Sequence, residues 1–103
     1  MRREFERRGF ECGMAVAQFL RDANTAHELW MEEKYDITLE VIESMKKQLE
    51  DLKRCGFDVS RISAVLKDLE SGLKEDPESE AISTMFFELK SQISKIIEEF
   101  SGK

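Results

Sequence analysis

The C-terminal part of the chain has the clearest pattern of apolar and polar positions. Its apolar residues recur at steps of four and three: Ile82, Phe86, Leu89, Ile93, Ile96 and Phe100. This spacing follows the helical period of about 3.6 residues and shows no strand-like alternation. Asp76 and Pro77 precede it, and a capping residue followed by proline is typical of a helix start. The pattern predicts a helix over about 77–100.

The preceding segment repeats the same spacing. Its apolar residues are Val59, Ile62, Leu66, Leu69 and Leu73. Before them, Gly56 can end an earlier helix in a left-handed turn, and Asp58 can cap the next one. We therefore predict one helix that ends near residue 55 and another over about 59–75. Because the connections are short, neighbouring helices are expected to pack antiparallel.

The segment from Met14 to Cys55 contains neither glycine nor proline. One apolar stripe stays in helical phase along it: Val16, Phe19, Leu20, Ala23, His27, Trp30, Ile37, Val41, Met45, Leu49 and Leu52. One continuous helix or two helices would satisfy this stripe, and the break signals lie at 24–25 and 34–38. Since unbroken helices of this length are uncommon in small domains, we prefer a break near 35–37, with helices over about 4–34 and 37–55.

These elements predict an all-α fold in a single domain, 1–103. The expected architecture is an antiparallel helical bundle of three to four helices, with a long N-terminal helical segment and a C-terminal helical hairpin. The longest charge-poor stretch, GMAVAQFL, is shorter than the roughly 20 apolar residues of a membrane-spanning helix. No membrane association is therefore expected.

The N-terminus shows no export signal, which favours a cytoplasmic protein. Cys12 and Cys55 are then expected to be two reduced, partly buried thiols, although their spacing leaves a disulfide open.

The charge balance argues against nucleic acid as a partner. The chain has 16 Lys and Arg against 22 Asp and Glu, for a net charge of −6, and neither half offers a basic surface. The N-terminal arginines alternate with glutamates, so a solvated, self-paired terminus is favoured over a phosphate-binding arm.

The stretch TAHELWMEEKYD, residues 25–36, holds the single His, Trp and Tyr of the chain among four carboxylates. On the helical stripe, His27 and Trp30 point inward, whereas the carboxylates point outward. No second His lies nearby, so His27 is expected to be a partly buried residue that donates to a neighbour rather than a metal ligand. No cofactor and no catalytic motif are predicted.

An acidic helix face leaves one enzymatic alternative open. Glu28, Glu32, Asp36 and Glu40 recur every four residues and could hold a hydrated Mg²⁺ or Mn²⁺ if a second acidic helix faced them. The alternative function is thus a Mg/Mn-dependent hydrolase of phosphorylated small molecules. A solvated helix face is the preferred interpretation.

Several apolar residues lie off the predicted core stripes. Phe10, Met14 and Ala17 project away from the stripe that begins at Val16, and Phe87 lies off the seam of the last helix. Such residues on separate helices suggest a second buried surface, which a homodimer would cover. We therefore predict a non-enzymatic helical interaction module, an adaptor, regulator or small subunit of a cytoplasmic complex, with these four residues at its interface.

Overall fold

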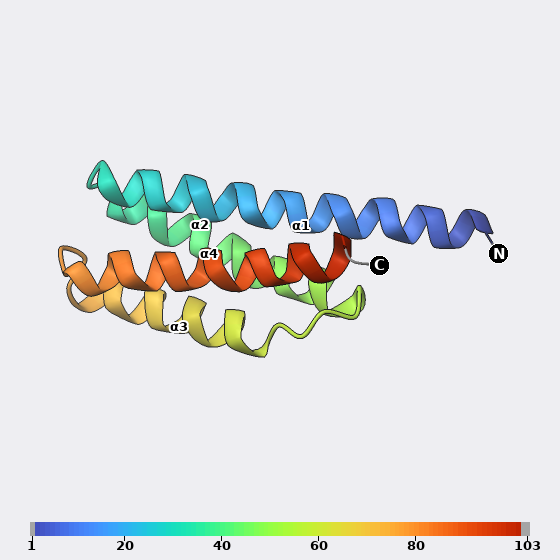
Figure 1. The fold of residues 1–103 in the computed structure, drawn as a ribbon. Helices are drawn as coiled ribbons and strands as arrows, with labels where there is room; N and C mark the ends of the chain where they lie inside the picture. Colours follow the sequence, from blue (N-terminus) through green and yellow to red (C-terminus); the bar gives the residue numbers. More distant parts are fainter. Residues whose placement is uncertain (1, 102–103) are drawn as a thin grey trace.

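The computed structural model describes the backbone of residues 2–101 and the side chains of residues 9–100. It contains four helices: α1 (Arg2–Met31), α2 (Tyr35–Arg54), α3 (Ser60–Glu75) and α4 (Glu80–Ser101). They lie side by side as an elongated antiparallel bundle with extents of 50 × 20 × 18 Å (Figure 1). The predicted all-α helical bundle is confirmed, and none of the described residues forms a strand.

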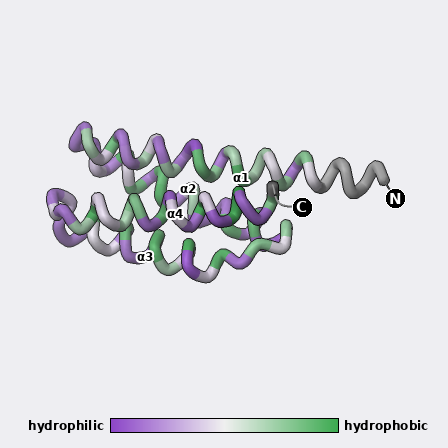
Figure 2. The backbone as a smooth tube through the Cα atoms, viewed as in Figure 1, coloured by the Kyte–Doolittle hydropathy of each residue, from purple (hydrophilic) through white to green (hydrophobic). Residues whose placement is uncertain are grey.

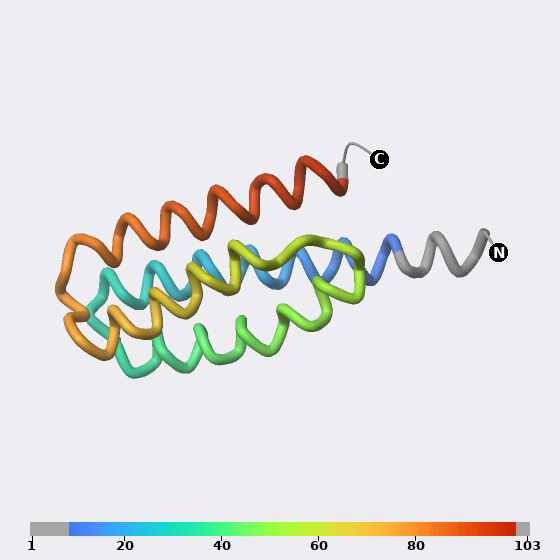
Figure 3. The backbone as a smooth tube through the Cα atoms, turned by 90° about the horizontal axis from the view of Figure 1, so that it is seen from below, coloured from blue at the N-terminus to red at the C-terminus, as the bar shows by residue number. Residues whose placement is uncertain are grey.

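The helices follow one another around the bundle. Helix α1 packs against α2 and α4, while α3 packs against the same two helices, so the α1/α3 and α2/α4 pairs are diagonal. The most extensive packing is within the α1–α2 and α3–α4 hairpins. Both hairpin turns lie at one end of the bundle, and the α2–α3 connection lies at the other (Figures 1 and 3).

The predicted apolar stripes of the last two helices form the core. Figure 2 shows apolar and polar positions alternating along each helix. The buried apolar residues of these helices are Ile62, Leu66, Leu69, Leu73, Ile82, Phe86, Leu89, Ile93 and Ile96. Only the ends of the predicted stripes differ, since Val59 is half-buried and Phe100 is partly exposed. A spacing of three and four residues was therefore a sufficient guide to these core faces.

The single apolar stripe predicted through the first half of the chain is confirmed in α2 at Met45, Leu49 and Leu52, but it was wrong at Ile37. Ile37 was expected inside but is 47% exposed, whereas Thr38 and Ile42 are buried. The cause is the turn between α1 and α2, which reverses the chain and restarts the helical phase. Thr38 satisfies its buried hydroxyl by donating to the Lys34 carbonyl at 2.8 Å.

Helix α1 ends in a Schellman motif that has a glutamate in the position usually taken by glycine. The Lys34 N–H donates to the Leu29 carbonyl at 2.9 Å, and the Glu33 N–H donates to the Trp30 carbonyl at 3.0 Å. Glu33 has a φ of 64°, in the left-handed region. The break between two helices is thus confirmed at residues 32–34, just ahead of the predicted 35–37. The other candidate break at 24–25 was wrong, since α1 runs through it.

Helix α2 ends in the same way, here at the predicted glycine. The Phe57 N–H donates to the Leu52 carbonyl at 3.3 Å, and Gly56 has a φ of 90°. The N-cap of α3 is Val59, one residue after the predicted Asp58. Asp58 nevertheless accepts hydrogen bonds at the start of this helix, from the Ser60 N–H at 3.1 Å and the Ser60 hydroxyl at 2.7 Å.

Helix α4 starts three residues later than the predicted proline-led start. The Ser79 N–H donates to the Asp76 carbonyl at 3.2 Å, so Pro77 lies in a turn rather than in the helix. Ser79 is the capping residue, since its hydroxyl accepts a hydrogen bond from the Ala81 N–H at 3.2 Å.

The two left-handed positions predict opposite effects of mutation. Glu33→Gly is expected to raise the free energy of unfolding by about 0.5–1 kcal/mol, because glycine has no Cβ to clash at positive φ. Gly56→Ala is expected to lower it by about 1–2 kcal/mol for the converse reason. Urea denaturation followed by circular dichroism measures both changes. Glu32→Gly is the control, and an equal gain in stability there would contradict the assignment to φ.

Candidate functional site

His27 is on α1, and its side chain packs against α4 in a cluster of aromatic rings. Its ring centroid is 4.9 Å from that of Phe86, nearly parallel, and 6.0 Å from that of Phe87, edge-on. The Lys90 Nζ lies 2.6 Å from the His27 Nδ1. Because an ammonium group only donates, Nδ1 must accept, and the ring is neutral with its proton on Nε2. His27 is partly buried as predicted, but toward Lys90 it accepts a hydrogen bond rather than donating one.

The surroundings of His27 favour its neutral form. Burial lowers the pKa of His27, the nearby Lys90 ammonium lowers it further, and Glu28 opposes both effects. A neutral imidazole that accepts from a lysine is a packing residue in this arrangement. The hydrogen bond to His27 holds the half-exposed Lys90 side chain across the contact between α4 and α1.

The lowered pKa of His27 predicts a pH-dependent stability. The unfolded chain takes up a proton near the ordinary pKa of 6.5, whereas the folded chain does so at a lower pH. The contribution of neutral His27 to the free energy of unfolding is therefore complete above pH 6.5. It is lost as the pH falls from there to the pKa of His27 in the folded chain. We expect thermal denaturation to show a steeper loss of stability between about pH 7 and 5 in the wild type than in His27→Gln. Equal slopes would show that carboxylates alone set the pH dependence.

Trp30 stabilises the end of the bundle at which the two hairpin turns lie. Its Nε1 donates to the Pro77 carbonyl at 2.6 Å, across 47 residues of sequence. This hydrogen bond joins the end of α1 to the α3–α4 turn. The side chains of His27 and Trp30 thus both link α1 to other parts of the bundle, His27 through Lys90 and Trp30 through Pro77.

The acidic residues of the enzymatic alternative do not form one face. Glu28 and Glu32 lie at the end of α1 and in the turn, whereas Asp36 and Glu40 lie on α2, which runs the opposite way. All four are exposed. Across the described residues, no group of three or more His, Cys, Asp or Glu side chains could hold a metal ion. The continuous acidic strip depended on a single helix, and the turn at 32–34 removes it.

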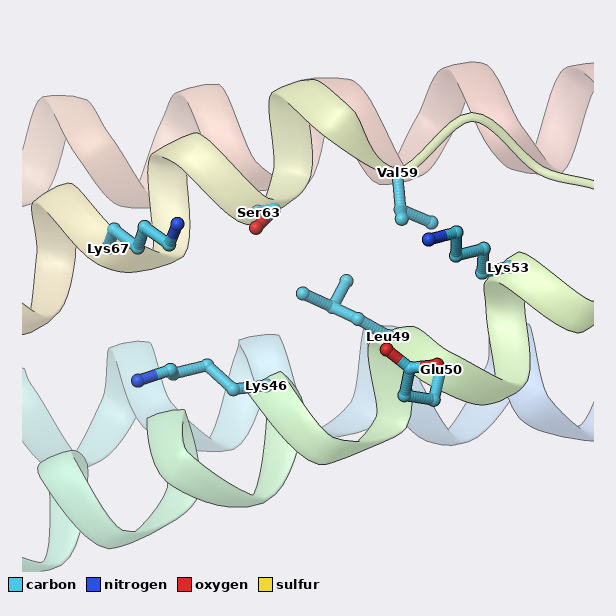
Figure 4. Close-up of a pocket in the computed structure, with 7 residues that line it drawn as sticks. All are labelled: Lys46, Leu49, Glu50, Lys53, Val59, Ser63 and Lys67. Atoms are coloured by element: carbon cyan, nitrogen blue, oxygen red, sulfur yellow. The ribbon is translucent and has the colours of Figure 1, made fainter.

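A shallow pocket between α2 and α3 has a volume of about 240 Å³. It is lined by Lys46, Leu49, Glu50, Lys53, Val59, Ser63 and Lys67 (Figure 4). Leu49 and Val59 were expected on the apolar stripes, but nothing in the sequence indicated that the three lysines lie near them, because this depends on how α2 and α3 are paired.

The lysines of this pocket do not build an anion site. Figure 4 shows Lys53 at one end and Lys46 and Lys67 toward the other, so their amino groups do not converge on one point. Lys46 is already held by Glu70, with 2.8 Å between Nζ and Oε2. This hydrogen bond is the main reason that the pKa of Glu70 falls to about 2. The contact is an ion pair between α2 and α3.

The four residues predicted at an interface are all exposed. The exposed fractions are 70% for Phe10, 59% for Met14 and 65% for Phe87, and Ala17 is exposed as well. Phe10, Met14 and Ala17 lie on one side of α1, next to the side that faces α4. We call the outer flank formed by these three residues and Phe87 the α1–α4 face.

The α1–α4 face has two separate parts along the bundle axis. Phe87 contacts His27, which is 13 residues beyond Met14 on α1. At a rise of about 1.5 Å per residue, these two parts lie roughly 20 Å apart. The structure therefore gathers the three α1 residues near one end of the bundle and places Phe87 near the other.

The two cysteines form a disulfide, so the expectation of reduced thiols was wrong. Cys12 on α1 and Cys55 at the end of α2 are bonded, with their Cα atoms 5.8 Å apart. The α1–α2 hairpin explains this pairing, because Cys12 lies 21 residues before Glu33 and Cys55 lies 22 residues after it. The sequence contained this nearly equal spacing, but it could be recognised only once the position of the turn was known.

An open groove of about 1270 Å³ runs beside the disulfide. Both cysteines, Met14, Phe57 and Phe100 are among the residues that line it. The rings of Phe57 and Phe100 have their centroids 6.1 Å apart. This end of the bundle is thus loosely covered, and the disulfide borders solvent-accessible space.

Comparisons with protein-family models, curated proteins and solved structures find no match for this chain. No helix in the described part of the chain is long and apolar enough to cross a membrane. The class that the fold defines is a four-helix bundle protein. The exposed faces of the bundle are the features of this protein that bear on its function.

Proposed function

We propose that the protein is a non-enzymatic helical interaction module that works as a homodimer through its α1–α4 face. The observation that carries this proposal is the exposure of Phe10, Met14 and Phe87 on the neighbouring helices α1 and α4. Single exposed apolar residues are ordinary on protein surfaces, but a flank with three large ones favours a covered surface.

The spacing of the face favours an antiparallel dimer. Most homodimers have a two-fold axis, so the same patch contacts itself in reverse. With the axis across the middle of the flank, Phe87 of one copy would approach Phe10 and Met14 of the other. The two parts of the face, roughly 20 Å apart, would then both be covered.

As its role we propose an adaptor, regulator or small subunit of a cytoplasmic complex. Stable disulfides are rare in the cytoplasm, where those that form are usually transient or redox-sensing. The proposed location therefore requires that the bond between Cys12 and Cys55 be reversible. The hydrolase alternative is not put forward, because the turn at 32–34 divides its four carboxylates and no group of three or more metal-binding side chains occurs in the described part of the chain.

Light scattering over a range of concentrations tests the homodimer. We expect a mass of twice 12.0 kDa for the wild type and a shift toward the monomer for Phe87→Asp, with unchanged helix content. Ile37→Asp is the matched control, because Ile37 is an exposed apolar residue on α2, outside the face. A wild-type monomer at every concentration, or a Phe87→Asp dimer of unchanged stability, would refute this use of the face.

A further inference from the structure

We propose that the Cys12–Cys55 disulfide is a reducible latch that holds residues 9–15 of α1 against the bundle and thereby regulates the α1–α4 face. This inference rests on the proposed function, since it concerns the same face. Its experiment is chosen so that the two proposals can fail separately.

The segment 9–15 has little packing of its own. Val16 is the first fully buried residue of α1 among the described side chains, and from 9 to 15 every residue is exposed or half-buried. Ala15 packs partly against the core. A Cβ on Gly13 would lie 3.5 Å from the ring of Phe100, which is itself partly exposed. The covalent bond at Cys12 is therefore the strongest tie between this segment and the bundle.

The same segment carries two of the four residues of the α1–α4 face, Phe10 and Met14. Phe10 and Met14 stand two residues before and two residues after Cys12. The disulfide thus holds the α1 backbone in place midway between Phe10 and Met14. At its other end, Cys55 directly follows α2 and precedes Gly56, where the Schellman motif closes that helix.

A reductant can reach the bond. Cys12 and Cys55 are both only half-buried, and both line the open groove. A small dithiol would act in two steps. One of its thiolates attacks a protein sulfur to form a mixed disulfide and releases the other cysteine as a thiol. Its second thiol then closes a ring on the reductant and releases the remaining cysteine, so that two electrons and two protons pass to Cys12 and Cys55.

Reduction should loosen the face before it affects the core. Once the bond is open, residues 9–15 depend on partial contacts, and their backbone is free to fray. Association would then have to order Phe10 and Met14 again, at a cost in conformational entropy. We expect the dissociation constant of the dimer to rise by about tenfold or more on reduction.

Hydrogen exchange and light scattering with and without dithiothreitol test the latch. The expected result is that the amides of residues 9–15 lose most of their protection and dimerisation weakens, while amides around Phe19, Ile42 and Leu89 stay protected and speed up only by the factor that the loss of global stability sets. The Cys12→Ser/Cys55→Ser double variant is the control. It should resemble the reduced wild type and should not respond to dithiothreitol.

The outcomes separate the two proposals. Unchanged exchange at 9–15 on reduction would overturn the latch. Exchange at 9–15 that speeds up only by the same factor as the core amides would overturn it as well, because the bond would then act on the fold as a whole. If the oxidised chain is monomeric at every concentration, the homodimer is refuted. Regulation of the face is then overturned with it, and exchange at 9–15 decides whether the bond still holds this segment.

Discussion

Phe86→Ala is expected to lower the free energy of unfolding by about 3–5 kcal/mol, one of the two largest effects in this protein. Phe86 is fully buried in the core. Its ring stacks on His27 and lies 6.0 Å, centroid to centroid, from Trp30. Alanine would leave a cavity where α1 and α4 meet and would remove both ring contacts. Urea denaturation monitored by tryptophan fluorescence and circular dichroism measures the loss.

Phe87 provides the matched control for this mutation, because it is the same residue type one position further along the same helix. Since it is mostly exposed, Phe87→Ala should change the stability of the monomer by no more than about 0.5 kcal/mol. Comparable losses at the two positions would contradict the orientation of α4.

Removal of the disulfide should produce the second large effect. The bond closes a loop across a sequence separation of 43 residues. A loop of this size constrains the unfolded chain by about 4 kcal/mol in the chain-entropy model, and measured effects are typically about 2–4 kcal/mol. We expect Cys12→Ser/Cys55→Ser to lose stability by this amount, measured by urea denaturation without reductant.

The corresponding alanine variant identifies the origin of that loss. Cys12→Ala/Cys55→Ala should lose about as much as the serine variant if the effect lies in the unfolded chain. A much smaller loss with alanine would instead point to poor burial of the serine hydroxyls. Stability equal to the wild type in both variants would show that the bond contributes nothing to the fold.

Much of the fold could be predicted from local spacing. In α3 and α4, residues such as Leu66, Leu69 and Leu89 were placed inside because helices repeat about every 3.6 residues. Gly56 marked a helix end because glycine has no Cβ to clash at positive φ, and Asp58 marked a helix start because its side chain can accept a backbone hydrogen bond there. These signals depend only on the nearest residues in the sequence.

The errors at the first turn depend on a residue in an uncommon conformation. Glu33 adopts the left-handed region, where glycine or asparagine is the usual signal, so nothing in its type revealed the end of α1. The turn therefore lies a few residues ahead of the predicted break, and Ile37 was expected inside in place of Thr38, although Met45, Leu49 and Leu52 were placed correctly. The pairing of Cys12 with Cys55 was missed for a different reason, because the expectation of reduced thiols followed from the expected compartment.

The candidate site was predictable in part for the same reasons. Helical phase alone places Phe10, Met14 and Ala17 on the outer side of α1, and their exposure agrees with it. The relation of Phe87 to them could not be derived, because it depends on which helices are neighbours around the bundle. The lysines of the α2–α3 pocket required the same knowledge.

The cyclic order of the helices also has a consequence for how the chain folds. Three of the four neighbouring pairs join helices that follow each other in sequence, and only α1 and α4 bring the two ends of the chain together. Contacts between distant segments form late, because a longer loop must be closed first. We therefore expect α1 and α4 to meet in the last step. The flank that carries Phe10 and Phe87 then exists only in a finished chain, so assembly would select for molecules that have already folded.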